Sequence, residues 1–150
     1  MDCFSDAIED LTLQDALNRY YAAHPQFTPW HNCKSAISRK LVRSHDISHV
    51  IYGCPTTMLG ELRLQFWNTF GSLIPKTIND VAAAISDKET RALLAQPGVL
   101  RFFLRHWREA LRVRKQAKLM TMKWRHFEEE PYLDQTVGAI RKTFNIQILV

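Results

Sequence analysis

Apolar side chains recur at every third or fourth position through most of this 150-residue chain, which is the spacing of an amphipathic α-helix. The pattern is clear over 35–52, stops at Gly53-Cys54-Pro55, and resumes over 56–72. Glycine commonly ends a helix and proline rarely continues one, so we expect two helices joined by a short turn as an antiparallel pair. No convincing strand-like alternation of period two is evident. The sequence therefore predicts an all-α fold.

Further helices are expected over 12–23, 79–94, 100–119 and 131–143, which gives a bundle of about five to seven helices in a single domain, residues 1–150. Thr12 suits the N-cap of the first of these helices, and Pro131 suits the first turn of the last. The segment 100–119 has the strongest amphipathic pattern, and we expect Trp107 and Leu111 on its core-facing side.

The cysteines and the N-terminal residues indicate the compartment in which the protein is expected. The three cysteines, Cys3, Cys33 and Cys54, are widely spaced and form no CxxC pair, which argues against a disulfide framework and a zinc finger. The first ten residues are acidic, unlike a secretion or import signal, and no apolar run is long enough to span a bilayer. The sequence predicts a cytoplasmic protein, with peripheral attachment to the inner face of a membrane as an alternative.

Positive charge is concentrated near the C-terminal third of the chain. The formal net charge is +5, and nine Lys or Arg but only one acid, Glu109, lie within 101–125. One face of the expected helix carries Arg101, Arg105, Arg108 and Arg112. Such a face suits an anionic membrane surface or an acidic partner, although an ordinary solvated face explains it equally well. The chain has no helix-turn-helix or RNA-binding sheet pattern, so nucleic acid is disfavoured.

Two histidines and two carboxylates form the candidate functional site. His45 and His49 are four residues apart and therefore share a helix face, Asp46 lies at the edge of that face, and Glu61 follows the turn. Burying unpaired carboxylates is costly, and a divalent cation removes that cost. We therefore predict a metal site made by His45, Asp46, His49 and Glu61. The alternatives are core histidines with satisfied ring nitrogens and a solvated acid at the helix start.

The residue types do not select one metal or one reaction. Two imidazoles and two carboxylates suit Zn, Fe, Mn or Co. A metalloprotease would need Glu directly after the first histidine, and this chain has Asp46 there. Four ligands on a tetrahedral zinc would leave no open position, whereas a five- or six-coordinate ion would keep one or two. No catalytic residue is assigned, and nothing gives a role to the nearby His31, Tyr52 or Cys54.

The spacing His-Asp-x-x-His, eleven residues, then Glu resembles the hallmark of the ubiquinone (coenzyme Q) biosynthesis family of the fourth Coq type. His45, Asp46, His49 and Glu61 match it position by position. The resemblance extends through Gly53, Pro55-Thr56, Met58-Leu59 and Gly60, and more weakly to Phe66-Trp67 and Lys123-Trp124, so that it covers about 37–146.

The resemblance implies a helical protein that binds a divalent metal, usually zinc. It also implies action on the prenylated aromatic precursor of ubiquinone, in which hydroxyl replaces the ring carboxylate. The implied partners are isoprenoid lipids and other proteins of a membrane-associated biosynthetic complex, with homo-oligomers left open. Because 44 residues precede His45, the chain resembles a short, bacterial type of member. A non-enzymatic lipid-binding or scaffold protein remains the alternative function.

Overall fold

The computed structural model describes residues 8–73, 101 and 105–149, and it confirms an all-α fold for this part of the chain. The five α-helices of these residues are α1 (Leu13–Ala23), α2 (Ala36–Tyr52), α3 (Met58–Phe70), α6 (Trp107–Ala117) and α7 (Val137–Phe144). The 3-10 helices η2 (Trp30–Asn32) and η3 (Glu130–Tyr132) lie between them. The helix expected over 79–94 lies outside the described residues.

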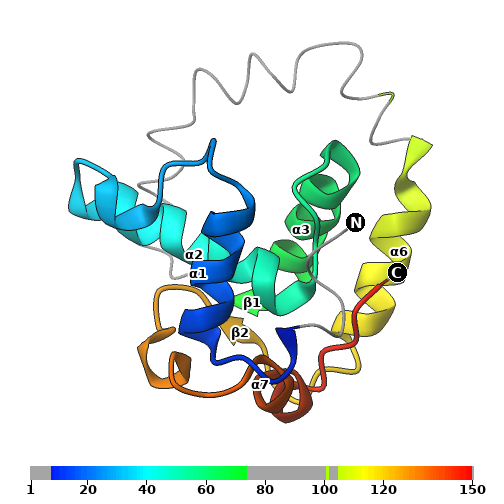
Figure 1. Ribbon diagram of the computed structural model, residues 1–150. Helices are drawn as coiled ribbons and strands as arrows, with labels where there is room; N and C mark the ends of the chain where they lie inside the picture. Colours follow the sequence, from blue (N-terminus) through cyan, green and yellow to red (C-terminus); the bar gives the residue numbers. More distant parts are fainter. Residues whose placement is uncertain (1–7, 74–100, 102–104, 150) are drawn as a thin grey trace.

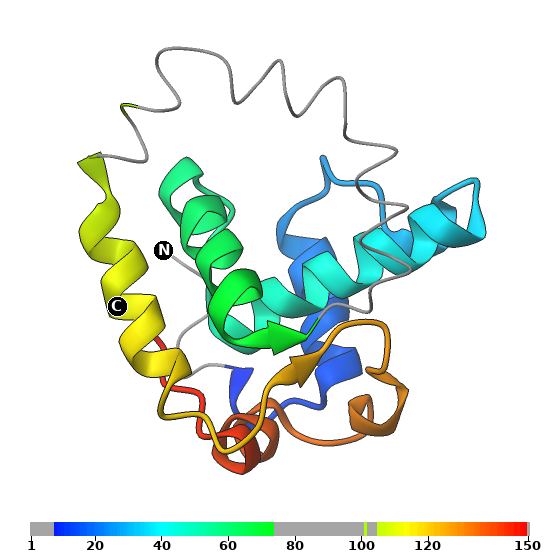
Figure 2. The same cartoon turned by 180° about the vertical axis from the view of Figure 1, so that it is seen from behind.

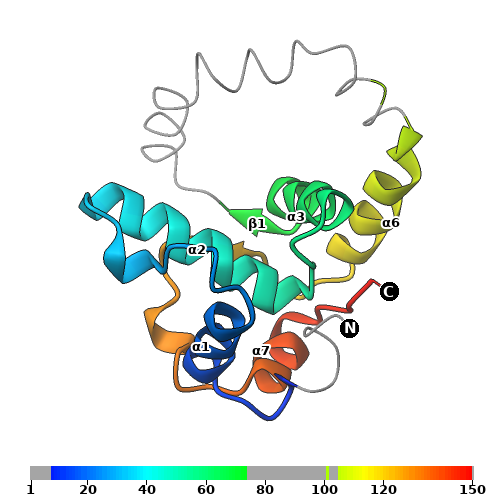
Figure 3. The ribbon, with the colours of Figure 1, turned by 45° about the horizontal axis from the view of Figure 1, so that its top comes forward.

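Helix α2 is the central element of the fold. Figure 3 shows α1 and α7 on one side of α2, whereas α3 and α6 lie on the other side. Buried aromatic rings fill the space between these layers: Tyr52 of α2 stacks on Trp67 of α3 with ring centroids 4.6 Å apart, and Trp124 packs edge-on against Phe144 of α7. No helix among the described residues has the length and apolar character needed to cross a bilayer.

The starts of α1 and α7 are fastened to each other. The side chains of Thr12 and Thr136 cap these helices by accepting hydrogen bonds from the backbone N–H groups of Asp15 and Ala139. The two threonines also face one another in an antiparallel β-bridge, and the backbone N–H of Val137 donates to the carbonyl of Leu11 at 2.9 Å. The N-cap predicted at Thr12 is confirmed. In Figure 1 and Figure 3, α7 lies near the start of α1.

Two short strands, β1 (Ser72–Leu73) and β2 (Trp124–Arg125), form a parallel pair that lies side by side in Figure 2. Strands of two residues are too short to produce a period-two pattern, so the sequence did not predict them. Lys123 secures this region, because its ammonium group donates to the carbonyl oxygens of Phe70 at 2.5 Å and Ala117 at 2.7 Å. That lysine therefore joins the ends of α3 and α6.

The prediction that Trp107 and Leu111 lie on the core-facing side of α6 is wrong. Trp107 and Leu111 are 53% and 49% exposed, whereas Val113 and Ala117 are buried. Helix α6 packs along α3, and the ion pair between Arg63 and Glu109, 3.1 Å long, holds the two helices in that rotation. The buried side of α6 is thus made of small residues and an ion pair, and its large apolar residues face outward.

The last helix is shorter than the range 131–143 expected from sequence. Pro131 lies in η3, and a turn of four residues separates η3 from α7. Thr136 begins α7 as its N-cap, and Asn145 ends it in the left-handed conformation with φ of 53°. The side-chain cap at Thr136 provides a stronger helix start than the proline, which explains the later beginning.

Candidate metal centre

Helix α2 carries both histidines, and its two ends are set by local sequence. The Ser35 hydroxyl accepts a hydrogen bond from the backbone N–H of Ser38 at 3.0 Å, which begins the helix. At the other end Gly53 adopts φ of 62°, a conformation that side-chain-bearing residues rarely adopt. The helix is therefore continuous through His45 and His49, whose rings meet edge-on with centroids 4.7 Å apart.

The turn after α2 brings Glu61 back to the histidines. Thr57 caps α3 through a hydrogen bond from the backbone N–H of Gly60 at 3.2 Å. A Cβ atom on Gly60 would lie 1.9 Å from the carbonyl oxygen of Pro55, so only glycine allows the turn to approach α3 this closely. This close approach places Glu61, in the first turn of α3, opposite His45 and His49.

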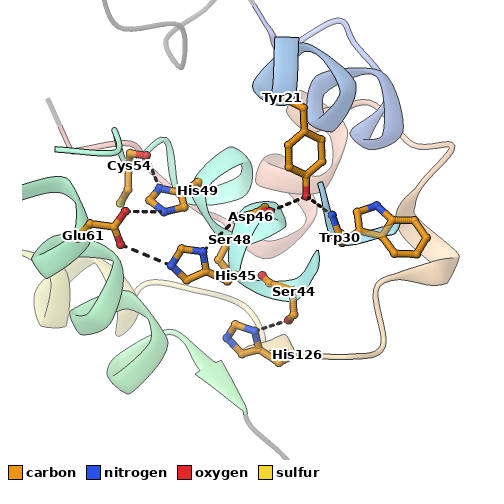
Figure 4. A network of polar contacts seen from close by, with 10 residues as sticks. All are labelled: Tyr21, Trp30, Ser44, His45, Asp46, Ser48, His49, Cys54, Glu61 and His126. Atoms are coloured by element: carbon orange, nitrogen blue, oxygen red, sulfur yellow. Dashed lines mark hydrogen bonds and ion pairs between the residues drawn. The ribbon is translucent and has the colours of Figure 1, made fainter. Parts of the chain in front are cut away.

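Three of the four predicted residues form a compact group of donor atoms. One carboxylate oxygen of Glu61 lies 3.1 Å from Nε2 of His49, and the other lies 3.4 Å from Nε2 of His45. The donor atoms of all three residues lie within 4.8 Å of one another. Figure 4 shows the carboxylate of Glu61 facing both rings.

This group fits a divalent cation. Ligand atoms about 2.1 Å from a tetrahedral ion are about 3.4 Å apart, close to the separations found here. The His49 side chain is fully buried, and its Nδ1 donates to the carbonyl oxygen of Cys54 at 2.8 Å. Nε2 of His49 is buried, points at the Glu61 carboxylate 3.1 Å away, and contacts no other hydrogen-bonding group among the described residues. A buried nitrogen without a partner, aimed at a carboxylate, is the arrangement that a metal ion satisfies.

Asp46, the fourth predicted residue, is directed elsewhere. Its Oδ1 lies 3.2 Å from Nδ1 of His45, on the far side of the ring from Glu61. Its Oδ2 accepts a hydrogen bond of 2.5 Å from the hydroxyl of Tyr21. Burial and the neighbouring Asp46 raise the pKa of Tyr21, so that this hydroxyl stays protonated and donates. The structure therefore gathers His45, His49 and Glu61, and places Asp46 behind His45.

The charges within the group are strongly coupled. Burial opposes a charged His45, but hydrogen bonds to Asp46 and Glu61 outweigh it and raise the pKa of His45 to about 9. Burial likewise opposes a charged Glu61, but the hydrogen bonds and charges of His45 and His49 lower its pKa to about 2. Near neutral pH, Glu61 is thus anionic and His45 carries a proton that a bound cation would displace.

A second buried polar network lies beside the first, and sequence reasoning missed it. The Ser44 hydroxyl donates to Glu129 at 2.5 Å, so Nδ1 of His126, 2.6 Å away, is the donor to Ser44. Nε2 of His126 is buried and has no hydrogen-bond partner within the described part of the chain. Burial, and the charge on His45, lower the pKa of His126 to about 4. Ser44 lies 82 positions from His126 and 85 from Glu129, so no local spacing could reveal the network.

The backbone beside His126 is in an unusual conformation. Phe127 has φ of 69°, a left-handed value that a bulky side chain rarely adopts. The carboxylate of Glu129 accepts a hydrogen bond from the backbone N–H of Phe127 at 2.8 Å, which helps to stabilise that turn. Glu129 therefore fixes both the Ser44 hydroxyl and the turn that carries His126.

Comparison with known proteins identifies the chain by its family. The model of the family described as coenzyme Q (ubiquinone) biosynthesis protein Coq4 matches residues 34–149. The matched range contains the whole donor group, whereas Tyr21, η2 and α1 precede it. No curated protein and no solved structure matches the chain.

Proposed function

Because the chain belongs to the Coq4 family of coenzyme Q (ubiquinone) biosynthesis proteins, we propose that it performs a metal-dependent step on a prenylated aromatic precursor. Family membership implies a role in ubiquinone biosynthesis. The proposed step is removal of the ring carboxylate and its replacement by hydroxyl. The observation that carries this proposal is the buried Nε2 of His49. It faces the carboxylate of Glu61, beside His45, and receives no hydrogen bond from any described residue.

The proposed ligands are His45, His49 and Glu61, and the proposed metal is zinc, with iron, manganese and cobalt as alternatives. A bound divalent cation supplies Lewis-acid stabilisation of a substrate carboxylate or ring oxygen. The chain's own groups hold the ligands in place: Asp46 fixes the ring of His45, and the carbonyl of Cys54 fixes the ring of His49. The side chains of His45 and Glu61 are each 40% exposed, so a substrate can reach them.

A cavity of about 500 Å³ next to His45 and Asp46 is the proposed site for the aromatic ring. Its other lining residues are Gln26, Phe27, Thr28, Cys33, Leu41 and Val42. The wall formed by Phe27, Leu41 and Val42 is apolar and suits a ring with its first isoprenoid unit. The amide of Gln26 and the hydroxyl of Thr28 can bind ring oxygens.

The reaction needs an electron acceptor. Replacing a ring carboxylate by hydroxyl releases carbon dioxide, adds an oxygen atom, and removes two electrons from the substrate. The sequence has no flavin or nicotinamide fingerprint, so molecular oxygen or a partner protein has to accept those electrons. The test is to incubate zinc-loaded protein with a prenylated aromatic acid carrying a ¹³C-labelled ring carboxyl, in air and under argon. Labelled carbon dioxide released only in air supports the proposal, and no release with or without added oxidant contradicts it.

Metal affinity is expected to rise with pH. The pKa of His45 is about 9 without metal, so below pH 9 a cation has to displace its proton. Affinity should therefore increase about tenfold per pH unit from pH 6.5 upward and level off near pH 9. Competition titrations with a chromogenic chelator at pH 6.5, 7.5 and 8.5 measure this slope. A flat profile would show that the proton on His45 is not displaced.

Blocking the cavity should separate substrate binding from metal binding. In Leu41→Trp the larger ring occupies part of the cavity, and we expect affinity for the prenylated acid to fall about tenfold or more. Metal content should stay unchanged, because Leu41 is not a ligand. Leu119→Trp is the matched control, since Leu119 is 49% exposed and lies outside the cavity. Equal binding by the two variants would exclude this cavity as the substrate site.

A second candidate function is that of a lipid-binding or scaffold protein at the inner face of a membrane. The observation that favours it is the outward face of α6, where Trp107 and Leu111 are exposed beside arginines. The guanidinium of Arg108 lies over the Trp107 ring at 5.9 Å, and Arg101 and Arg105 are also exposed. Aromatic and basic side chains together suit the surface of an anionic bilayer.

Charge reversal tests this second function. Each arginine near an anionic membrane surface contributes about 1 kcal/mol, so Arg105→Glu with Arg108→Glu should weaken vesicle binding about 30-fold or more. Co-sedimentation with vesicles containing phosphatidylserine measures the change at low and at physiological salt. The control is Lys34→Glu with Lys40→Glu, which reverses two exposed charges far from α6 in the chain. Similar losses in the two double variants would argue against docking through α6.

A further inference from the structure

Both carboxylate oxygens of Asp46 are occupied by groups that lie away from Glu61. Asp46 is only 6% exposed. Its Oδ1 lies 3.2 Å from Nδ1 of His45, and its Oδ2 accepts a hydrogen bond from the Tyr21 hydroxyl, with the two oxygens 2.5 Å apart. Figure 4 shows His45 between Asp46 and Glu61, with the carboxylate of Asp46 turned toward Tyr21. In this arrangement neither carboxylate oxygen of Asp46 faces Glu61.

Tyr21 is itself held in place. The backbone N–H of Trp30 donates to its hydroxyl oxygen at 3.4 Å, and the Trp30 ring lies under the guanidinium of Arg43 at 4.9 Å. The ring of Tyr21 also packs edge-on against Tyr20 at 5.4 Å. Tyr21 belongs to α1 and Trp30 to η2, and both precede the residues that match the family model. A segment outside the matched region therefore reaches the metal centre through Asp46.

We propose that Tyr21 is a positioning residue that sets the number of protein ligands, because it holds Asp46 against His45 and away from the cation. A cation bound there would have three protein ligands, His45, His49 and Glu61, and a position free for substrate. Four protein ligands would close a tetrahedral site, whereas three leave it open. This inference rests on the proposed metal centre, and it concerns only the number of its ligands.

Removing the Tyr21 hydroxyl takes away one of the groups that stabilise the charge on Asp46. A nearly buried carboxylate that loses a short hydrogen bond keeps its charge but loses stabilisation. The hydrogen bond between Tyr20 and Asp46 would remain, and a cation bound beyond His45 would be the strongest further source of compensation. In Tyr21→Phe we therefore expect Asp46 to move to the cation as a fourth protein ligand and to fill the open position.

Cobalt substitution reports this change directly. Co²⁺ is loaded into wild type, Tyr21→Phe, Asp46→Asn and the double variant, and metal content and visible spectra are recorded with and without azide. Wild type should show an open site whose spectrum shifts with azide. Tyr21→Phe should keep the intense absorption of a four-coordinate ion, with its bands moved by the new carboxylate ligand, and should lose the azide shift. The double variant should regain the azide shift, because an asparagine amide is a poorer ligand than a carboxylate.

Two further variants complete the experiment. Asp46→Asn alone should keep the wild-type spectrum and azide shift but bind Co²⁺ about 10- to 100-fold more weakly, as expected for a group that supports a ligand. Tyr52→Phe is the matched control, because it removes another buried tyrosine hydroxyl, which contacts Ser72 at 2.7 Å. It should leave the spectrum unchanged.

The outcomes separate this inference from the proposed function. Stoichiometric Co²⁺ binding with identical spectra in wild type and Tyr21→Phe overturns the role of Tyr21 and leaves the metal centre standing. A changed coordination in Asp46→Asn alone shows that Asp46 is already a ligand, and this also overturns the inference. Absence of Co²⁺ binding by the wild-type protein overturns both the inference and the metal centre.

Discussion

The double substitution His45→Ala, Glu61→Ala is expected to abolish stoichiometric metal binding while the helices stay folded. Only His49 would remain of the three donors. Four-ligand zinc sites contribute about 10–16 kcal/mol, or about 3 kcal/mol per ligand, so the loss of two ligands should weaken binding by about four orders of magnitude. Both replaced side chains are 40% exposed, so their removal leaves no large cavity. Elemental analysis after dialysis, together with far-UV circular dichroism, measures both effects.

The control for this experiment is His31→Ala with Glu128→Ala. It removes one imidazole and one carboxylate from exposed positions outside the donor group. Its metal content should equal that of the wild type. If the His45, Glu61 variant keeps one metal per chain, the cation binds elsewhere and the proposed centre is wrong. Wild-type protein that contains no metal and binds none in titration would contradict the centre as well.

The features that could be predicted from the sequence are those with a local signal. The N-cap at Thr12, the helix end at Gly53 and the restart before Met58 depend on residues within one helical turn of the element they define. The facing of His45 and His49 follows from their four-residue spacing, which any continuous helix enforces. The placement of Glu61 required only that the turn be short. These features could therefore be predicted from the chain alone.

The remaining features depend on contacts between distant segments. Asp46 borders the histidine face, but it accepts a hydrogen bond from Tyr21, 25 residues away in the chain. The face of α6 that is buried depends on its packing against α3 and on the pair of Arg63 with Glu109, and periodicity cannot identify the helix that will cover a given face. Sequence patterns predict elements and local spacing, whereas the orientation of the side chains at this candidate site is a property of the tertiary structure.

Arg141→Met is expected to lower the free energy of unfolding by about 3 kcal/mol. The side chain of Arg141 is only 5% exposed. It donates to the backbone carbonyls of Val50 at 2.7 Å and Ile51 at 2.9 Å, and it forms an ion pair with Glu9. The two carbonyls belong to the last turn of α2, where helical partners are lacking. Methionine keeps much of the volume but leaves those acceptors and Glu9 without the guanidinium.

Lys142→Met is the matched control for Arg141, because it changes the neighbouring, exposed residue of the same helix and should alter stability by less than about 0.5 kcal/mol. Urea unfolding of metal-free protein gives both values without a contribution from bound cation. Arg141 binds the carbonyls of Val50 and Ile51, one and two residues after His49. A loss of stability in Arg141→Met without loss of metal content would therefore show that Arg141 supports the helix and not the metal site. Equal stability of the two variants would show that solvent replaces the guanidinium, and that α7 does not secure the helix that carries the histidines.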